Sequence, residues 1–558
     1  MRRAFLIWLC LSALADPSLC SGQGGQINGV IADPIAGRRV PGAVVTVFDS
    51  ARTVLKQALA DDSGRFRIED VPTARRIRIL KIGYRPSEMV VTPPMSVRFN
   101  LERLPSLLEP VRTSDQPRCS RNATRPAAFG LWEQARAALL GAVIARSTNT
   151  ATVTRVNFTR YMSPRSDEIR FQAVRRETSL SLRSFDAVFP ATEFMRRGFA
   201  EPAGGSQILF YGPDAEVLLD DALAEHYCLE LAGRKAERPT QVGLRFRPMA
   251  RERGRVDIDG TLWIDTLART LSDVEYTYLG LSSWATPLRP GGRISFEETS
   301  PATVWIDQWT IRMTGAAIDV TGRPTTLDFT LRPHVVEGGA ELASAVWPDG
   351  RQWKATLSDV ALKLVTRGGA PLVGARVRLD STDYSGITDS VGSVMIDDVL
   401  PGPYRVSVLD STLAIVDTAL PAATGFVATR GVTANVVTAV PTLGEFVTQE
   451  CLANEVFTER SYMLVARIVA GRDSVPAYRA KWRIETPAGA NDMLVPSGIY
   501  GHGETGANGM VYFCTRLNAG RRVILRAWPA GDKAEDAGTE VTVTLRDRIT
   551  AVKLVLPP

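Results

Sequence analysis

The sequence predicts a mainly β, multidomain protein in which antiparallel β-sandwiches flank a domain built from a helix on a curved antiparallel sheet. Two observations support this fold class. One short pattern, a polar turn with a glycine followed by an alternating strand, is written three times: ADDSGRFRIEDVP (60–72), ITDSVGSVMIDDVLP (387–401) and ETGANGMVYFCTRL (504–517). Between the first two copies lies a long run of alternating segments with one helical stretch, which predicts a separate domain.

Length and composition describe a folded chain with room for several domains. The chain has 558 residues, of which 45% are hydrophobic and 23% charged. The formal net charge of +6 is a weak excess over this length. Nucleic-acid binding would need that charge concentrated on one face, so no nucleic-acid partner is expected, while anionic lipid or glycan remains open.

The first residues predict export. MRRAFLIWLCLSALA has two arginines followed by an apolar run too short for a membrane span. We expect a signal peptide over residues 1–22, with cleavage either near Ala15 or near Gly22. Leucines before Cys10 and Cys20 argue against a lipoprotein. The mature protein is expected to be periplasmic, outer-membrane associated or extracellular, with no transmembrane segment.

Each copy of the repeated pattern follows another alternating stretch. These stretches are RVPGAVVTVFD (39–49), APLVGARVRLD (370–380) and SVPAYRAKWRI (474–484). Their period of two predicts strands with one buried face. Gly64, Gly392 and Gly509 can take positive φ, so we expect each turn to close a hairpin into the next strand. Three small antiparallel sandwiches follow from this pattern.

The first unit resembles a known family. PGAVVTVFD, ADDSGRFRIEDVP and RIRILKIGY together look like the carboxypeptidase regulatory-like domain, a transthyretin-like or Ig-like sandwich. The resemblance covers residues 26–104, is looser over 354–440 and is faint over 457–558. The three expected sandwiches span 26–104, 354–447 and 451–558. It implies an accessory module with a carbohydrate-binding-like fold and no catalytic residues.

Two of these units end in similar tails, LPSLLEPV (104–111) and VPTLGEFV (440–447). The first tail, at the start of a linker predicted over 105–118, resembles the connector to the plug of TonB-dependent transporters. The rest of the chain is too short for a plug and a large barrel, and it contains two further sandwiches. We therefore reject a transporter but leave open an association with that transport system.

The region 119–346 is expected to form the curved-sheet domain. PAAFGLWEQARAALLGAVIA places apolar residues on one helical stripe, and GPDAEVLLDDALAEHYC predicts a short second helix. The hairpin GTLWID…LSDVEYTY is similar to envelope lipoprotein-carrier folds, which implies a half-barrel with a hydrophobic groove. A ligand site of this domain would then lie between the helix 131–143 and the concave sheet face.

The sequence contains only weak signals for catalytic or metal-binding residues. HVVE (334–337) has the HxxE spacing of zinc carboxypeptidases, but a third ligand would have to be His502 from another sandwich. GHGETG (501–506) lacks a following helix and is interpreted as a hairpin loop. His226 is interpreted as a helix-end residue. VDIDG (256–260) and ADDSG (60–64) could be Ca²⁺ loops, but neither continues with the EF-hand ligand spacing, so both are interpreted as turns. We expect no catalytic, cofactor-binding or metal-binding residues, and hence no enzyme.

Two surface patterns allow more than one interpretation. Arginines crowd the middle region, either as solvated strand faces or as a basic rim for anionic lipid or glycan. Trp305 and Trp309, four residues apart on a strand, are expected to share a face, where they pack in a core or stack on a sugar. The arginines are Arg155, Arg160, Arg170, Arg175, Arg176, Arg183, Arg196, Arg197, Arg245, Arg247, Arg251, Arg253 and Arg255.

Four cysteines remain after the signal peptide. An even number in an exported chain predicts disulfides, and four cysteines allow three connectivities. Cys119 and Cys228 fall in the middle domain, whereas Cys451 and Cys514 fall in the last sandwich. Pairing within domains therefore predicts the bonds Cys119–Cys228 and Cys451–Cys514.

These observations favour a non-catalytic, exported, modular binding or scaffold protein of the bacterial cell envelope that recognises carbohydrate or another envelope protein. Two alternatives stay open. One is a metallopeptidase-like hydrolase, and the other is a lipid or lipoprotein carrier that uses the middle groove.

Overall fold

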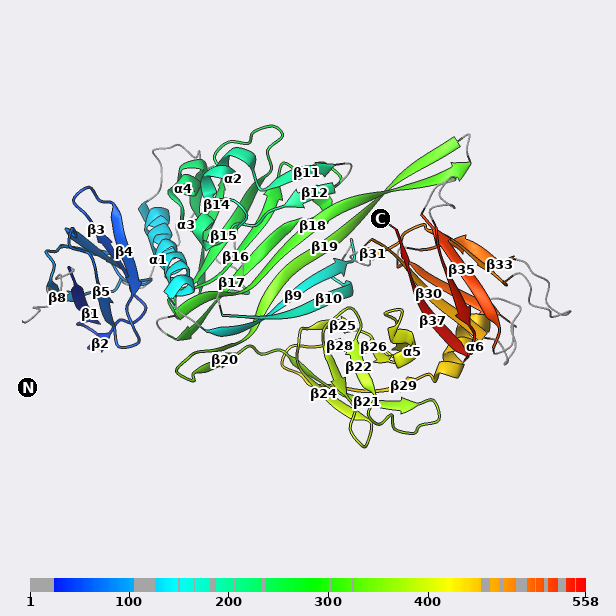
Figure 1. Cartoon of the computed structure of the whole chain (residues 1–558). Coiled ribbons are helices and arrows are strands. Elements are labelled where there is room, and N and C mark those ends of the chain that lie inside the picture. Colours follow the sequence, from blue (N-terminus) through cyan, green and yellow to red (C-terminus); the bar gives the residue numbers. More distant parts are fainter. Residues whose placement is uncertain are drawn as a thin grey trace, which may run out of the picture.

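The structure, a computed structural model, describes most of the chain. It covers residues 25–104, 126–148, 151–164, 166–180, 187–204, 207–232, 236–300, 303–323, 326–452, 462–471, 475–487, 499–506, 508–515, 520–529, 538–546 and 548–557. The signal peptide and linker predictions lie outside these ranges. The described part is mainly β, and three sandwiches flank one large sheet, as the sequence predicted (Figure 1). Within the described ranges, no helix is both long and apolar enough to cross a membrane.

The first sandwich consists of two sheets. In one, β1 (Ile27–Asp33) lies between β2 (Arg38–Arg39) and β5 (Arg65–Ile68), and β8 (Met95–Asn100) runs parallel to β1. The other has the order β4 (Val54–Leu59), β3 (Val44–Phe48), β6 (Arg76–Leu80) and β7 (Ser87–Val90). Alternating residues such as Val45 and Val47 meet Phe66 and Ile68 in a closed core.

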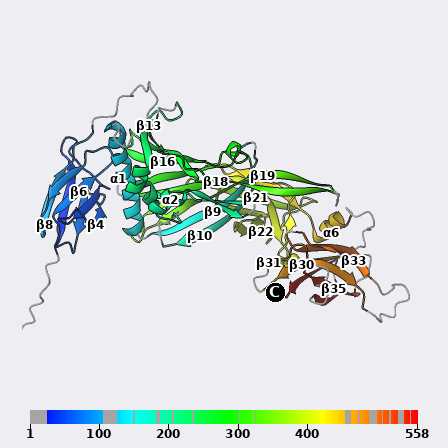
Figure 2. The same cartoon turned by 90° about the horizontal axis from the view of Figure 1, so that it is seen from above.

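The curved-sheet domain is one antiparallel sheet with helices on one face (Figures 1 and 2). Its order is β10 (Ile169–Ser179), β9 (Thr152–Met162), β19 (Thr326–Val346), β18 (Thr303–Arg323), β17 (Gly291–Ser300), β16 (Thr270–Leu279), β15 (Asp257–Asp265), β14 (Gln241–Pro248) and β13 (Tyr227–Ala232), with β20 (Gln352–Lys354) beside β19. The helices are α1 (Pro126–Thr148), α2 (Ala191–Arg197), α3 (Ala215–Leu219) and α4 (Asp221–His226). A small hairpin of β11 (Ala200–Gly204) and β12 (Gln207–Phe210) completes this layer.

The expected short helix in this domain is two helices. The Asp214 side chain accepts the Val217 N–H at the start of α3, and the Asp220 side chain accepts the Ala222 N–H at the start of α4. Each aspartate is an N-cap, so the second one ends the first helix and begins the next.

The second sandwich follows the same plan as the first. One sheet is β24 (Ser393–Val399), β21 (Ser358–Thr366) and β29 (Ala434–Val440). The other is β23 (Ser385–Ile387), β22 (Arg376–Leu379), β26 (Val406–Leu409) and β27 (Leu420–Pro421). A pair of short strands, β25 (Gly402–Tyr404) and β28 (Phe426–Ala428), and the helical turn α5 (Ser411–Ala414) lie at its side.

The third sandwich repeats the plan again. Its sheets are β31 (Val475–Pro476), β30 (Tyr462–Ala470) and β34 (Met510–Thr515), with β37 (Ile549–Leu556) parallel to β30, and β33 (Ile499–Glu504), β32 (Lys481–Glu485), β35 (Arg522–Trp528) and β36 (Thr539–Thr544). It is joined to the second sandwich by α6 (Leu443–Leu452). The Thr442 Oγ1 accepts the Glu445 N–H while the Glu445 carboxylate accepts the Thr442 N–H, a capping box that begins this helix.

The repeated glycine occupies the same place in all three sandwiches. Gly64, Gly392 and Gly509 have φ of 70°, 76° and 67°. In each case the glycine carbonyl accepts a first-strand N–H at 2.8 Å, from Ile31, Leu364 or Ile468. The expected hairpin is wrong in detail, because the turn crosses from one sheet to the other and the following strand pairs with the first strand of the unit.

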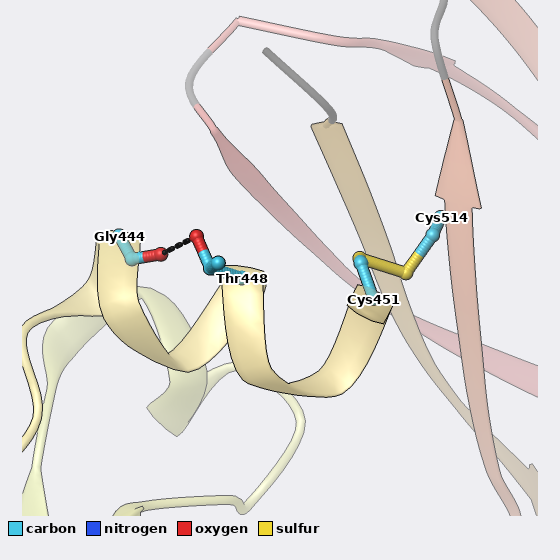
Figure 3. The surroundings of a disulfide bond; sticks show 4 residues. All are labelled: Gly444, Thr448, Cys451 and Cys514. Atoms are coloured by element: carbon cyan, nitrogen blue, oxygen red, sulfur yellow. Dashed lines mark hydrogen bonds between the residues drawn. A yellow bond between two sulfur atoms is a disulfide. The ribbon is translucent and has the colours of Figure 1, made fainter. Parts of the chain in front are cut away.

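The disulfide between Cys451 and Cys514 joins α6 to β34 (Figure 3). Their Cα atoms are 5.7 Å apart, and Cys451 is buried in an apolar cluster shared by the second and third sandwiches. This pairing confirms one of the two predicted bonds. Cys228 is buried and disulfide-bonded, but its expected partner Cys119 lies outside the described residues, so that pairing stays a prediction.

We expect Gly392→Ala to destabilise the second sandwich by about 3 kcal/mol, because it combines positive φ with a steric clash. A Cβ there would lie 2.7 Å from the Leu364 carbonyl oxygen. Gly369 has a similar φ of 84° but open space around it, so Gly369→Ala should cost about 1 kcal/mol. Urea unfolding of both variants measures the difference. Equal losses would show that the carbonyl contact does not require glycine.

Replacing both Cys451 and Cys514 by alanine should lower the stability of the last sandwich by up to about 4 kcal/mol, since the bond closes a loop with a sequence separation of 63 residues. Thr448→Ala is the matched control. It removes the 2.9 Å bond from the Thr448 hydroxyl to the Gly444 carbonyl in the same helix without touching the crosslink (Figure 3). Denaturation monitored by Trp fluorescence measures the free energy of unfolding of each variant. An equally small loss in both variants would contradict the expectation.

Candidate functional site

The space between α1 and the sheet is filled by side chains. Leu131, Trp132, Ala135 and Leu139 are at most 5% exposed, and they pack in one cluster with residues of β13 to β18, including Phe246. Packing of this kind has the density of a protein core. The groove that the carrier resemblance implied is therefore occupied, and this space is not a ligand site in the structure.

The opposite face of α1 packs on the first sandwich. Ala137 and Ile144 form a second apolar cluster with Val44 and Leu80. Next to it, the Gln134 side chain accepts the Gly83 N–H at 2.6 Å and donates to the Tyr84 carbonyl at 3.1 Å. The sequence predicted a single apolar stripe, whereas α1 is buried on both sides.

A cleft opens where the second sandwich meets the edge of the large sheet. Two adjoining hollows of about 610 and 690 Å³ share Arg378 and Ser381. The first lies between β9, β10 and the loop 381–383, and the second lies between β10, β25 and β28. We call both hollows together the interdomain cleft. They are lined by Asn157, Phe158, Thr159, Arg170, Phe171, Gln172, Ala173, Val174, Arg175, Arg378, Asp380, Ser381, Thr382, Asp383, Pro403, Tyr404, Arg405, Gly425, Phe426 and Val427.

Backbone hydrogen bonds hold the two walls of the cleft together. The Val174 N–H donates to the Ser381 carbonyl at 3.0 Å. The Arg176 N–H donates to the Asp383 carboxylate at 2.6 Å, and the Arg176 guanidinium lies 5.0 Å from the centre of the Tyr384 ring. Below these contacts, Val156, Phe158 and Val174 enter the apolar core of the second sandwich. The cleft is therefore part of a packed interface.

An ion-pair chain continues across the same interface. Arg160 donates to the Gln172 Oε1 at 3.1 Å, to Glu337 at 3.1 Å and to the Pro401 carbonyl at 3.1 Å. Its side chain is thus shared between β10, β19 and the second sandwich. Arg430 of the second sandwich pairs with the buried Glu341 of β19 at 2.6 Å. These bonds fix the orientation of Gln172 on the cleft wall.

Most arginines that suggested a basic rim are paired with carboxylates. Arg155 pairs with Glu177, Arg160 with Glu337, Arg176 with Asp383, Arg196 with Glu193, Arg197 with Glu201, Arg245 with Asp259, Arg247 with Glu230 and Arg255 with Asp257. Arg183 lies outside the described residues. Arg170, Arg175 and the exposed Arg251 and Arg253 have no carboxylate partner among the described residues. Of these four, Arg170 and Arg175 line the interdomain cleft.

Sequence reasoning missed the other half of the cleft. Arg378 on β22 and Arg405 between β25 and β26 alternate with core residues of the second sandwich, a pattern that normally indicates a solvated face. Tyr404 and Phe426 stack with ring centres 5.7 Å apart. The excess of arginine in RVRL (376–379) was a visible signal, but its position next to β10 depends on how the domains dock.

Comparison with known proteins identifies one of the domains. Residues 26–102 match the family model of the carboxypeptidase regulatory-like domain. The first sandwich is a carboxypeptidase regulatory-like domain. This confirms the resemblance that the sequence indicated, and α1 therefore packs on a regulatory-like domain. The second and third sandwiches share its strand order. No curated protein matches the chain.

Among solved structures, the Bacillus anthracis TIE protein matches with 9% identity and a TM-score of 0.14, covering 63% of this chain and 62% of that chain. A Streptococcal ancillary pilin matches with 11% identity and a TM-score of 0.14, covering 48% and 82%. GBS52, a minor pilin of Streptococcus agalactiae, has 12% identity and a TM-score of 0.12, covering 36% and 95%. The chain spans less than two thirds of the first of these proteins, and such low scores carry no argument about function.

The HxxE pair does not converge. His334 and Glu337 are three residues apart on β19, so their side chains lie on opposite faces of the sheet. His334 is exposed, and Glu337 is paired with Arg160. His502 lies far along the chain on β33, exposed, and pairs in register with Arg483 of β32. Within the described ranges, no group of three His, Cys, Asp or Glu side chains could hold a metal ion.

The GHGETG segment is a strand and not a hairpin loop. Most of it belongs to β33, which pairs with β32. A Cβ at Gly501 would lie 2.7 Å from the Phe513 ring, and one at Gly503 would lie 3.1 Å from the Trp482 ring. The alternating glycines therefore make room for two aromatic side chains, which explains the pattern without a phosphate.

The other candidate sites have structural roles. His226 ends α4, with its Nδ1 2.8 Å from the Ala222 carbonyl oxygen. VDIDG lies at the start of β15, where Asp257 pairs with Arg255 and Asp259 with Arg245. The Asp61 carboxylate of ADDSG accepts the Ser63 and Arg65 N–H groups and so shapes the turn. These carboxylates have arginine or backbone partners and form no shared cation site.

Trp305 and Trp309 lie on opposite faces of the sheet, which corrects the expectation that they share one. Ser295 pairs with Gln308 and Phe296 with Ile306, so Asp307 is an extra residue in β18. This β-bulge reverses the alternation. Trp309 packs against the helix-side core, whereas Trp305 stacks on Trp347 with ring centres 5.5 Å apart.

The bulge residue should give the protein a pH-dependent stability. Burial, together with nearby Glu297, raises the pKa of Asp307 from 3.8 to about 6. The folded state thus holds this proton more tightly than the unfolded chain, and the resulting stability is present below about pH 4 and lost as the pH rises through 6. Asp307→Asn should therefore be more stable than wild type at about pH 7, by on the order of 2 kcal/mol.

Below about pH 4 the difference between Asp307→Asn and wild type should vanish, since both side chains are then neutral. Thermal unfolding across this pH range makes the measurement, with the exposed Asp397→Asn as a control that should leave the pH profile unchanged. A variant as stable as wild type at every pH would contradict the raised pKa.

Proposed function

We propose that this protein is a non-catalytic, exported binding and scaffold protein of the bacterial cell envelope. The observation that carries the proposal is the continuous packing of its domains. One apolar cluster includes Phe158 of the large sheet, Val377 of the second sandwich, Val447 of α6 and Met463 of the third sandwich. Together with the docking of α1 on the regulatory-like domain, this makes a fixed array of four units.

A fixed array suits presentation of a binding surface more than it suits catalysis. Active sites need converging acid, base or nucleophilic groups in a cleft. The interdomain cleft presents arginines, aromatic rings and amides, which are groups that bind and orient. Its carboxylates Asp380 and Asp383 have hydrogen-bond partners in Ser407 and Arg176.

The two alternatives find less support. A metallopeptidase-like hydrolase would need His334 and Glu337 on one side of a strand, and they lie on opposite sides. A lipid or lipoprotein carrier would need an open groove beneath α1, and that space is packed with buried side chains. Recognition of envelope carbohydrate or of another envelope protein is the function that the cleft chemistry favours.

Binding of the purified mature protein to a glycan array, combined with pull-down from envelope extract, tests the proposal. We expect the protein to retain an envelope glycan. Mass spectrometry of the retained glycan after prolonged incubation should show that it is unchanged. Cleavage or modification of a retained glycan would overturn the non-catalytic assignment. Failure to bind any envelope glycan or protein would overturn the binding function.

Rigidity is testable at the docking of the first sandwich. Gln134→Ala removes both partners of the Gly83 N–H and the Tyr84 carbonyl at the α1 interface, and each unsatisfied group costs about 1–3 kcal/mol. We expect a broader distance distribution between spin labels on the first sandwich and on the curved sheet. Gln26→Ala, which removes an amide hydrogen bond to Asn28 on the other sheet of the first sandwich, should leave the distribution narrow. A wild-type distance distribution as broad as that of Gln134→Ala would contradict a fixed array.

A further inference from the structure

We propose that the interdomain cleft binds an acidic oligosaccharide, a short sugar chain that carries carboxylate or phosphate groups. This inference rests on the proposed binding function and names its ligand class. It follows from three independent properties of the cleft: its unpaired positive charge, its buried polar atoms without partners, and its exposed aromatic and aliphatic side chains.

The positive charge of the cleft is not neutralised. Arg170 and Arg175 come from β10, and Arg378 and Arg405 come from the second sandwich. Within the described residues, none of these four guanidinium groups has a carboxylate within 4 Å, in contrast to the paired arginines elsewhere on the sheet. A guanidinium group presents a rigid fork of donors that fits carboxylate or phosphate oxygens, so four of them around one cleft select an anion.

Two buried polar atoms of cleft residues have no hydrogen-bond partner. Gln172 is 2% exposed, its Oε1 accepts from Arg160, and its Nε2 has no hydrogen-bond partner. The Nε of Arg378 is also buried without a partner. Buried donors are normally satisfied, because leaving one unpaired is costly. Both residues line the cleft, so a small rotation of either side chain would bring its unpaired N–H to an acceptor oxygen of a bound ligand.

The cleft also offers apolar surface of the kind that packs on sugar rings. Phe171 is 43% exposed and Val427 is 66% exposed at the second hollow. Phe426, stacked on Tyr404, lines the same hollow. The C–H face of a sugar ring packs on such side chains while its hydroxyl and acidic groups reach the arginines. Both hollows fall within the range of roughly 300–1,000 Å³ that small-ligand sites occupy.

An acidic sugar fits this cleft better than a nucleic acid does. Asp380 and Asp383 line the cleft together with the arginines. Carboxylates accept hydrogen bonds from sugar hydroxyls, but they repel a continuous phosphate backbone. A chain with anionic groups interspersed among hydroxyls matches this alternation of charge.

Isothermal titration calorimetry with the mature full-length protein tests the proposal. The probes are tetragalacturonate, its uncharged methyl ester, a phosphorylated core oligosaccharide and a dT oligomer of similar charge. We expect at least one of the two acidic sugars to bind, with the ester at least tenfold weaker than tetragalacturonate if the carboxylates are what is recognised. Binding should weaken as salt is raised. The two acidic sugars distinguish carboxylate from phosphate recognition.

Arg378→Gln together with Arg405→Gln should weaken binding of the acidic sugar at least tenfold. The matched control is Arg98→Gln together with Arg522→Gln, which removes the same charge from exposed positions on the first and third sandwiches and should change affinity less than twofold. Arg405→Gln alone, at an exposed position, keeps the test valid if the double variant unfolds. Equal losses in both double variants would assign binding to overall charge and overturn the site.

Different results would contradict the ligand class and the proposed binding function. If neither acidic sugar binds, or if the dT oligomer binds more tightly, the ligand class is wrong, although glycan-array binding of a neutral sugar would leave the binding function intact. If the sugars bind but are cleaved, the ligand class holds and the non-catalytic function fails.

Discussion

The docking of the second sandwich on the helix-free face of β9, β10 and β19 is the interaction on which the rest of the arrangement depends. Without it, Val156, Phe158 and Val174 would form an exposed apolar patch on a sheet edge, a known risk for aggregation. The same contact brings Arg378 and Arg405 next to Arg170 and Arg175. It also begins the apolar cluster that continues through α6 to the third sandwich. The cleft and the fixed order of domains thus have one physical origin.

Electrostatics divides the surface of the large sheet into two kinds of region. On most strands an arginine faces a carboxylate across the sheet, as Arg245 faces Asp259 and Arg247 faces Glu230. Exposed pairs of this kind contribute little stability, but they cancel the charge that would otherwise attract anions everywhere. Positive charge remains uncancelled at the cleft, where two domains each contribute arginines.

The sequence predicted much of the local structure and little of the assembly. Period-two patterns, the glycine turns and the Cys451–Cys514 bond depend on residues close in sequence or within one domain, and the structure shows them. The Thr442–Glu445 capping box is visible in the sequence, but it was not used to predict α6. The burial of α1 on both faces, the bulge at Asp307 and the cleft could not be read, because each depends on which surfaces meet. A one-residue bulge is invisible in a pattern of alternation, yet it moves Trp309 to the other face.

The strand order of the sandwiches has a mechanical consequence. In each unit the first and last strands are parallel neighbours: β1 with β8, β21 with β29 and β30 with β37, the last over eight residue pairs. Tension applied at the two ends of such a unit pulls these strands past each other along their length. All the hydrogen bonds of the ladder then resist at once in shear, instead of opening one after another as in a hairpin pulled from its open end. A chain of such units would bear load between its ends while the cleft keeps its shape.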